Sequence, residues 1–213
     1  MTIVWHGHSC FEIANETTTV VTDPHDGSSI GIKPPNVKAD IVLVSHDHYD
    51  HNKVKSVEKD STSVVRKGKK RIQDIVISTY TAYHDKKEGK KRGSNTIFTF
   101  TFDGINFCHL GDLGHMLDKK TVEELGTIDI LFIPVGGVFT INAEEAIKLC
   151  KIIKPKVAIP MHYRVGGLSL PIERVDEFLE RVQSLYRIRH VANEIEIDHE
   201  DLPDDNEVWV FTL

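Results

Sequence analysis

The sequence has few cysteines and no long hydrophobic segment. Its 213 residues include three cysteines, Cys10, Cys108 and Cys150, without the CxxC spacing of thiolate metal sites and without the even number that pairing needs. Each lies in an apolar context, so we expect buried free thiols and a reducing compartment. No apolar run approaches the ~18 residues of a membrane span, and Met1–His6 lacks the character of a secretory signal. We therefore expect a cytoplasmic protein without a membrane span.

Excess positive charge and nucleotide-binding motifs are also missing. The formal net charge is −6, which argues against a general nucleic-acid-binding protein. The sequence contains no phosphate-binding glycine-rich loop and no motif for a nucleophilic serine or cysteine. Its 40% hydrophobic and 27% charged residues are ordinary for a globular protein. With no linker and no internal repeat, residues 1–213 are expected to form one domain.

Histidines, in contrast, are concentrated in one short segment. Three of the 12 histidines fall within Ser45–His51, directly after Ile41–Val44, an apolar β-branched stretch that predicts a buried strand. His46 and His48 are two residues apart, so they project to the same side of an extended chain. Imidazole and carboxylate groups without thiolates suit zinc, manganese, iron or nickel. A solvated, histidine-rich loop is the alternative interpretation.

Other predicted strands also end in residues that can bind metals. These strand-end residues are Asp23, His84, Asp112 and His162. Each histidine alone is more often a surface or core residue, but together they predict a metal centre at one edge of a sheet. Two roles stay open. His8 is a ligand or a turn residue near the site, and Asp23 either orients a ligand histidine or is a plain turn residue. We take both as residues that support the ligands or contact substrate.

The hydrophobic patterns predict a mixed α+β fold. Helices are expected around Val54–Lys59, from a cap at Asp118 to Leu125, from a capping box at Asn142–Glu145 to Ile153, and over Pro171–Tyr186. Strands are expected at Thr2–Trp5, Cys10–Ala14, Thr18–Thr22, Ile41–Val44, Val64–Val65, Ile75–Ser78, Thr96–Phe102, Ile105–Leu110, Ile128–Val135 and Val157–Pro160. Glu194–Ile197 and Val208–Phe211 are expected to pair with each other as closing strands.

Taken together, these residues resemble the metallo-β-lactamase superfamily. His46-x-His48-x-Asp50-His51 matches the HxHxDH signature of that family without a departure. The motifs Gly7-His8-Ser9, Gly111-Asp112-x-Gly114 and Gly136-Gly137-x-x-Thr140 are similar to a small branch that includes N-acylphosphatidylethanolamine phospholipase D-like and ascorbate-6-phosphate lactonase-like proteins. The resemblance covers essentially the whole chain. It implies a four-layer αβ/βα sandwich with a metal centre at one end.

The resemblance also implies a specific set of metal ligands. Two divalent ions per chain are expected, with zinc as the first choice and manganese, iron or nickel as alternatives. One ion would bind His46, His48 and His84, the other would bind Asp50, His51 and His162, and Asp112 would bridge them. His109 is the alternative to His84. We choose His84 because His109 lies only three residues before Asp112, whereas relatives place this ligand well upstream.

The expected activity is hydrolysis by a hydroxide shared between the two ions, with Asp50 and Asp112 as the catalytic carboxylates. The expected substrate is a small ester, either a phosphodiester or a lactone. A metal-dependent nuclease is a second hypothesis, which the net charge of −6 and the lack of an added nucleic-acid domain disfavour. A non-catalytic metal-binding protein is a third, which the complete ligand set disfavours. A diiron redox role is also known in the superfamily.

A basic segment, Lys86–Gly93, follows His84 and carries five cationic side chains. Cations beside a metal pair would attract a negatively charged substrate over a Debye length of ~8 Å. Arg92 can offer two parallel hydrogen bonds to a phosphate or carboxylate, and Thr140 is a further candidate for substrate contact. We therefore predict an anionic small-molecule substrate. A plain solvated loop is the alternative.

Overall fold

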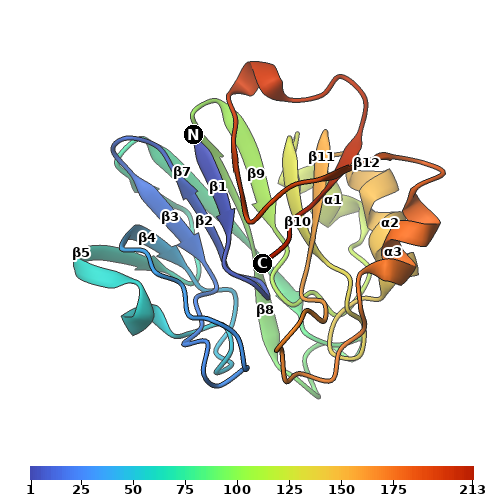
Figure 1. The fold of residues 1–213 in the computed structure, drawn as a ribbon, viewed down its shortest axis with the longest axis horizontal. Coiled ribbons are helices and arrows are strands. Elements are labelled where there is room, and N and C mark those ends of the chain that lie inside the picture. Colours follow the sequence, from blue (N-terminus) through green and yellow to red (C-terminus); the bar gives the residue numbers. More distant parts are fainter.

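The computed structural model describes residues 1–213 as two β-sheets with α-helices beside one of them (Figure 1). The six-stranded sheet has the spatial order β13 (Glu194–Glu196), β1 (Thr2–Trp5), β2 (Phe11–Ala14), β3 (Thr19–Thr22), β4 (Ala39–Leu43) and β5 (Glu58–Val65). The eight-stranded sheet has the order β12 (Arg187–His190), β14 (Glu207–Val210), β11 (Val157–Met161), β10 (Ile130–Pro134), β9 (Ile105–His109), β8 (Ser94–Phe102), β7 (Ile75–Tyr83) and β6 (Lys70–Ile72). The helices are α1 (Lys119–Leu125), α2 (Ala143–Ile153) and α3 (Asp176–Val182), with 3-10 helices η1 (Val54–Ser56) and η2 (His199–Asp201). The α+β fold class is confirmed.

The main core lies between the two sheets and under the helices. Along β1 and β2, alternate residues face it, as the two-residue period of a strand requires: Ile3 and Trp5 of β1 and Ile13 of β2 belong to one cluster of 47 buried residues. The opposite face of the six-stranded sheet carries a smaller cluster that includes Val42 and Val57. There η1 and neighbouring connections provide the cover, so the outer layer on this side contains no α-helix.

Local capping explains where two helices begin. Asp118 accepts a hydrogen bond from the Thr121 backbone N–H at the start of α1. Asn142 and Glu145 form the predicted capping box at the start of α2. The buried side of α2 includes Cys150, and all three cysteines are buried and free. These expectations are confirmed.

The predicted helix around Val54–Lys59 is wrong beyond its first turn. Only η1 forms there, and β5 begins at Glu58. The chain pairs in parallel with β4, with a register shift at the beginning of the ladder. Residues 58–61 of β5 are exposed and polar, so the sequence shows no apolar alternation over them. Backbone pairing with a buried neighbour, rather than side-chain pattern, makes this segment a strand.

The C-terminal region differs from expectation in two ways. Helix α3 begins at Asp176 rather than near Pro171, because the Glu173 N–H bonds to the Gly136 carbonyl and the Glu173 carbonyl accepts from Arg164. The predicted pairing of Glu194–Ile197 with Val208–Phe211 is wrong. Strand β13 pairs antiparallel with β1, whereas β14 lies between β11 and β12, parallel to both. Strand β12 was not expected, since its Arg-Ile-Arg-His sequence is mostly exposed.

Strand direction brings the predicted site residues to one edge. Strands β3 and β4 are parallel in one sheet, and β9, β10 and β11 are parallel in the other. Strand β7 runs in the same direction as β9, since both are antiparallel to β8. The carboxyl ends of parallel strands meet at the same edge of a sheet.

The structure contains no helix with the length and hydrophobicity that crossing a bilayer requires.

Candidate metal centre

Unusual backbone conformations occur where the chain leaves the strands near this edge. The φ angles of His8, Asp23 and His162 are 56°, 38° and 52°. Residues other than glycine seldom adopt this left-handed region, and strained backbone of this kind gathers at functional sites. Asp23 and His162 directly follow β3 and β11, and His8 lies in the turn between β1 and β2. The main chain therefore bends at three points around one space.

Four imidazole rings surround one carboxylate oxygen in that space. The Oδ2 atom of Asp112 lies 3.0 Å from Nε2 of His162, 3.1 Å from that of His84, 3.3 Å from that of His51 and 3.8 Å from that of His46. Asp112 Oδ1 and His46 Nε2 are buried and have no hydrogen-bond partner. Buried polar atoms are normally paired, so these two atoms are suited to bind a cation.

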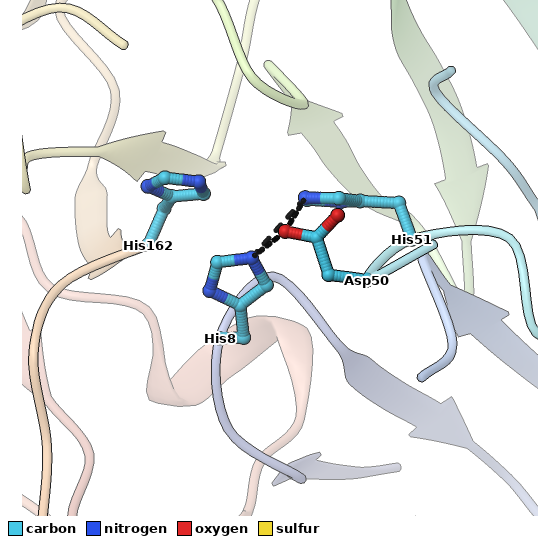
Figure 2. A group of neighbouring side chains, drawn as sticks. All are labelled: His8, Asp50, His51 and His162. Carbon is cyan, nitrogen blue, oxygen red and sulfur yellow. Dashed lines mark hydrogen bonds and ion pairs between the residues drawn. The ribbon is translucent and has the colours of Figure 1, made fainter. Parts of the chain in front are cut away.

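The atoms that can bind metal form compact groups. One group contains His46, His48 and His84, and a second contains His8, Asp50, His51 and His162 (Figure 2). Within each group the ligand atoms lie within 4.8 Å of one another. Asp112 contacts histidines of both groups. Each group offers the nitrogen and oxygen donors that a divalent transition metal prefers.

Hydrogen bonds on the outer ring nitrogens determine which nitrogen faces the centre. His51 Nδ1 donates to Asp23 Oδ2 over 3.1 Å, and His84 Nδ1 donates to the Phe139 carbonyl over 3.1 Å. Because Nδ1 carries a proton in each ring, Nε2 is the nitrogen left to bind a metal. The two rings are thus held in the form that binds a metal.

Ser45 extends this arrangement to His46. Its Oγ donates to Asp23 Oδ2 over 2.6 Å and lies 2.8 Å from His46 Nδ1, from which it accepts. The Ser45 backbone N–H donates to Asp23 Oδ1 over 2.7 Å. Asp23 therefore orients two histidines of the HxHxDH segment, one directly and one through Ser45.

Close packing at Gly111 positions Asp112. The Asp112 N–H donates to Asn95 Oδ1 over 2.9 Å, and Asn95 Nδ2 donates to the Leu110 carbonyl over 2.8 Å. Gly111 has a φ of 54°, and a Cβ atom there would lie 2.3 Å from Asn95 Oδ1 and 2.6 Å from Ser45 Cβ. Any side chain at Gly111 would displace the residues that fix the central aspartate.

Burial and mutual charge change the proton affinities of these groups. Burial opposes ionisation of Asp112, but His162 and His51 outweigh it and lower the pKa of the carboxyl well below its usual range. Burial also opposes a charged His51, yet Asp112 and Asp50 raise its pKa well above the usual value. Burial and the charge of His51 lower the pKa of His46 to about 3. In the metal-free protein, positive charge is therefore favoured on His51 and disfavoured on His46.

Two adjoining cavities open beside the centre. The metal cavity, with a volume of about 300 Å³, is lined by ligand-type residues such as His48 and Asp112 and by Lys91 and Arg92. The basic cavity, with a volume of about 330 Å³, is lined by residues that include Lys86, Lys87 and Thr140. Lys91, Arg92 and Phe139 line both cavities.

The structure brings together all seven residues expected to bind metal, with His84 among them. His109 lies elsewhere, with Nε2 donating to the Ser9 carbonyl over 3.0 Å. Thr140 lines the basic cavity and not the metal cavity. Ser45 and Asn95 were missed. Ser45 directly precedes His46, which is a usable signal, but nothing in the sequence marks Asn95.

A family model described as the beta-lactamase superfamily domain matches residues 2–162 of the chain. The chain belongs to the metallo-β-lactamase superfamily. It is 29% identical to a UPF0173 metal-dependent hydrolase from Archaeoglobus fulgidus, over 79% of this chain and 85% of that protein. It is also 29% identical to the UPF0173 metal-dependent hydrolase MK1542 of Methanopyrus kandleri, over 87% and 93%.

A solved structure gives the same result. The fold is similar to that of a candidate zinc-dependent hydrolase of the metallo-β-lactamase superfamily from Thermotoga maritima, with a TM-score of 0.80 and 36% sequence identity. The match covers 99% of this chain and 97% of the other. The expected superfamily and its α+β fold of two sheets are confirmed, and the chain is a metal-dependent hydrolase of that superfamily.

Proposed function

We propose that this protein is a binuclear hydrolase that cleaves a small anionic ester, either a phosphodiester or a lactone. The observation that carries the proposal is the position of Asp112 Oδ2, which lies 3.0–3.3 Å from the Nε2 atoms of His51, His84 and His162. These rings come from both ligand groups. A carboxylate in this position is suited to bridge two ions.

The donor set fits two divalent transition metals. His46, His48 and His84 would hold one ion, and Asp50, His51 and His162 the other, with Asp112 between them. The set contains no thiolate and suits zinc, with manganese, iron or nickel as alternatives. Two such ions supply Lewis acidity and lower the pKa of a shared water toward neutrality.

Asp50 is the residue suited to orient the attacking water. It lines the metal cavity. Burial opposes its ionisation, but the charge of His51 and hydrogen bonds from His51 and His8 lower the pKa of its carboxyl. An ionised carboxylate at the cavity wall can accept a hydrogen bond from the water that attacks the ester and so orient it.

Charge at the metal cavity favours an anionic substrate. Asp85 accepts hydrogen bonds from four backbone N–H groups of the basic segment, those of Lys87, Gly89, Lys91 and Arg92. The Arg92 guanidinium lies 5.2 Å from the Phe139 ring centroid, at a distance typical of a cation–π contact. Lys91 and Arg92 are thus held at the cavity wall, where they can pair with a phosphate or carboxylate.

The size of the metal cavity favours a small substrate. Its volume of about 300 Å³ is at the lower end for ligand pockets. Tyr49, Phe139 and Leu170 add apolar surface to the lining, which suits the carbon part of an ester. A long polymer would have to bind largely outside this cavity.

The proposal is tested with enzyme that has been stripped by chelation and reloaded with a single metal. A panel of phosphodiesters, lactones and thioesters, each with an uncharged analogue, is assayed with each metal. Activity should require metal, and kcat/KM should favour the anionic member of each pair. Asp50→Ala should lower kcat by at least roughly 10²-fold, because it removes both a metal ligand and the carboxylate that orients the water. Hydrolysis that persists after complete metal removal, or unchanged kcat in Asp50→Ala, contradicts the proposal.

A further inference from the structure

The ring of His8 lies among the candidate metal-binding atoms themselves, and not only beside residues that bind metal. Its ring is fully buried, and its Nε2 lies 3.1 Å from Asp50 Oδ2 and 3.2 Å from His51 Nε2 (Figure 2). The His162 ring centroid is 4.3 Å from that of His8. His8, Asp50, His51 and His162 are the four members of the second ligand group. Spacings near 3 Å are those expected between donor atoms around an ion with bond lengths of about 2.1 Å.

The backbone of His8 is fixed independently of its ring. Its carbonyl accepts hydrogen bonds from the His162 N–H, over 3.1 Å, and from Trp5 Nε1, over 3.2 Å. Its φ of 56° is a strained value, and it follows Gly7 with a φ of 91°. The turn after β1 is thereby tied to the end of β11 in the other sheet, and the ring is directed into the centre. Such strain at a buried polar residue indicates a functional constraint.

Hydrogen bonding leaves this buried ring incompletely satisfied. His51 donates through Nδ1 to Asp23, so its Nε2 is the nitrogen that faces His8 Nε2. Without metal, a proton on His51 Nε2 can join the two nitrogens over 3.2 Å, and a divalent ion would take the place of that proton. A single proton on His8 Nε2 would have to serve Asp50 and His51 at once, and His8 Nδ1 has no partner in either case. A divalent ion would satisfy the Asp50, His51 and His8 atoms together.

We propose that His8 is an additional ligand of the second metal ion, beside Asp50, His51, His162 and the bridging Asp112. This inference rests on the proposed binuclear function and adds to it an asymmetry between the two sites. The second site would have five protein ligands, whereas the first would have His46, His48 and His84 plus the bridge. His48 is also only partly buried. The second ion should therefore be held more tightly, and chelators should remove the first ion before it.

The test compares His8→Gln and His8→Ala with a matched control, His25→Gln. His25 is also a buried histidine with an unpartnered Nδ1, but its Nε2 donates to the His6 carbonyl and it belongs to neither ligand group. Glutamine at position 8 can still donate a hydrogen bond to Asp50 but is a poor metal ligand. Each protein is titrated with zinc and with manganese against a chromophoric chelator, and bound metal is counted by elemental analysis.

We expect wild type and His25→Gln to bind two ions per chain. Both His8 variants should lose affinity for one ion by about 100-fold or more, exceeding the ~10–100-fold typical of residues that only support a ligand. Added imidazole should restore that ion in His8→Ala. If His8→Gln binds both ions like wild type, His8 is only a hydrogen-bond donor and the inference is overturned. If wild type itself binds one ion or none, the binuclear function fails instead.

A crystal structure of the metal-loaded wild type decides the question even if the variants do not fold. Anomalous scattering at the metal absorption edge locates the ions. The inference predicts a distance of about 2.0–2.2 Å between His8 Nε2 and the second ion. A distance above roughly 3 Å, with both ions present, contradicts it and leaves the binuclear function intact.

Discussion

The Nδ1 atom of His51 lies 3.1 Å from Oδ2 of Asp23, although the two residues are 28 positions apart in sequence. Both side chains are fully buried. The contact joins the end of β3 to the histidine segment that follows β4, and it determines the tautomer of His51. Burial raises the cost of ionising Asp23, but the hydrogen bond from His51 and the charge of that ring lower the pKa of the carboxyl overall.

Asp23→Asn should weaken metal binding without unfolding the protein. An amide that keeps its oxygen toward the Ser45 N–H would place its NH₂ group against His51 Nδ1, and His51 would then have to carry its proton on Nε2. We expect roughly 10–100-fold weaker binding, measured by competition with a chromophoric chelator. Asp47→Asn is the control, because this carboxylate lies within the same HxHxDH segment but is 84% exposed. Equal affinity in Asp23→Asn and Asp47→Asn would show that Asp23 does not orient His51.

His84→Ala and His109→Ala should have different effects, the first on metal content and the second on stability. His84→Ala should lower the metal content per chain, because His84 Nε2 lies 3.1 Å from Asp112 Oδ2. His109→Ala should retain the metal but lose about 1–3 kcal/mol of stability, because it leaves the buried Gly111 N–H without its acceptor, His109 Nδ1. Elemental analysis and urea unfolding of both variants provide the comparison. Loss of metal in His109→Ala with full metal in His84→Ala would reverse the assignment.

Substitution of Lys91 and Arg92 by glutamine should raise KM for an anionic substrate and leave kcat largely unchanged. A hydrogen bond to a charged group contributes about 1.5–3 kcal/mol, so KM should rise roughly tenfold or more. Lys90→Gln is the matched control, because Lys90 is on the same segment but lines neither cavity. KM should also depend less on salt in the double variant. An equal change in Lys90→Gln and the double variant would assign the effect to general surface charge.

Metal binding should release protons near neutral pH. His51 has a raised pKa in the metal-free protein, chiefly because the nearby Asp112 and Asp50 outweigh the effect of burial. Below that raised pKa a proton occupies His51 and competes with metal, so affinity should rise as pH increases through it. Titration of metal into weakly buffered protein at pH 7, followed with a pH indicator, should show this release. Binding without proton release and with affinity independent of pH between 6 and 8 would contradict it.

Much of the site could be predicted from sequence because its residues lie where strands end. The HxHxDH segment after β4, Asp112 after β9 and His162 after β11 needed only strand periodicity to place them at one edge. The sequence placed His8 near the site but left open whether its ring reaches the ligand atoms, since this depends on a left-handed turn and on a hydrogen bond to His162, 154 residues away. Asn95 could not be identified either, because its role depends on contact with the Asp112 backbone.

The fold could be predicted less well where pairing outweighs side-chain pattern. Strand β5 has an exposed polar beginning, and β12 is an exposed strand at a sheet edge, so neither shows an apolar period. Strands β13 and β14 looked alike in sequence but belong to different sheets. Short strands of this kind are assigned by the partners available in the folded protein.

The central claim is that two ions lie in this centre with Asp112 between them, and anomalous diffraction from crystals of the metal-loaded protein tests it most directly. We predict two peaks per chain, about 3.5–4 Å apart. One should lie against His46, His48 and His84, the other against Asp50, His51 and His162, and Asp112 should contact both. A single peak, or no peak, after saturation with zinc and with manganese would contradict the account.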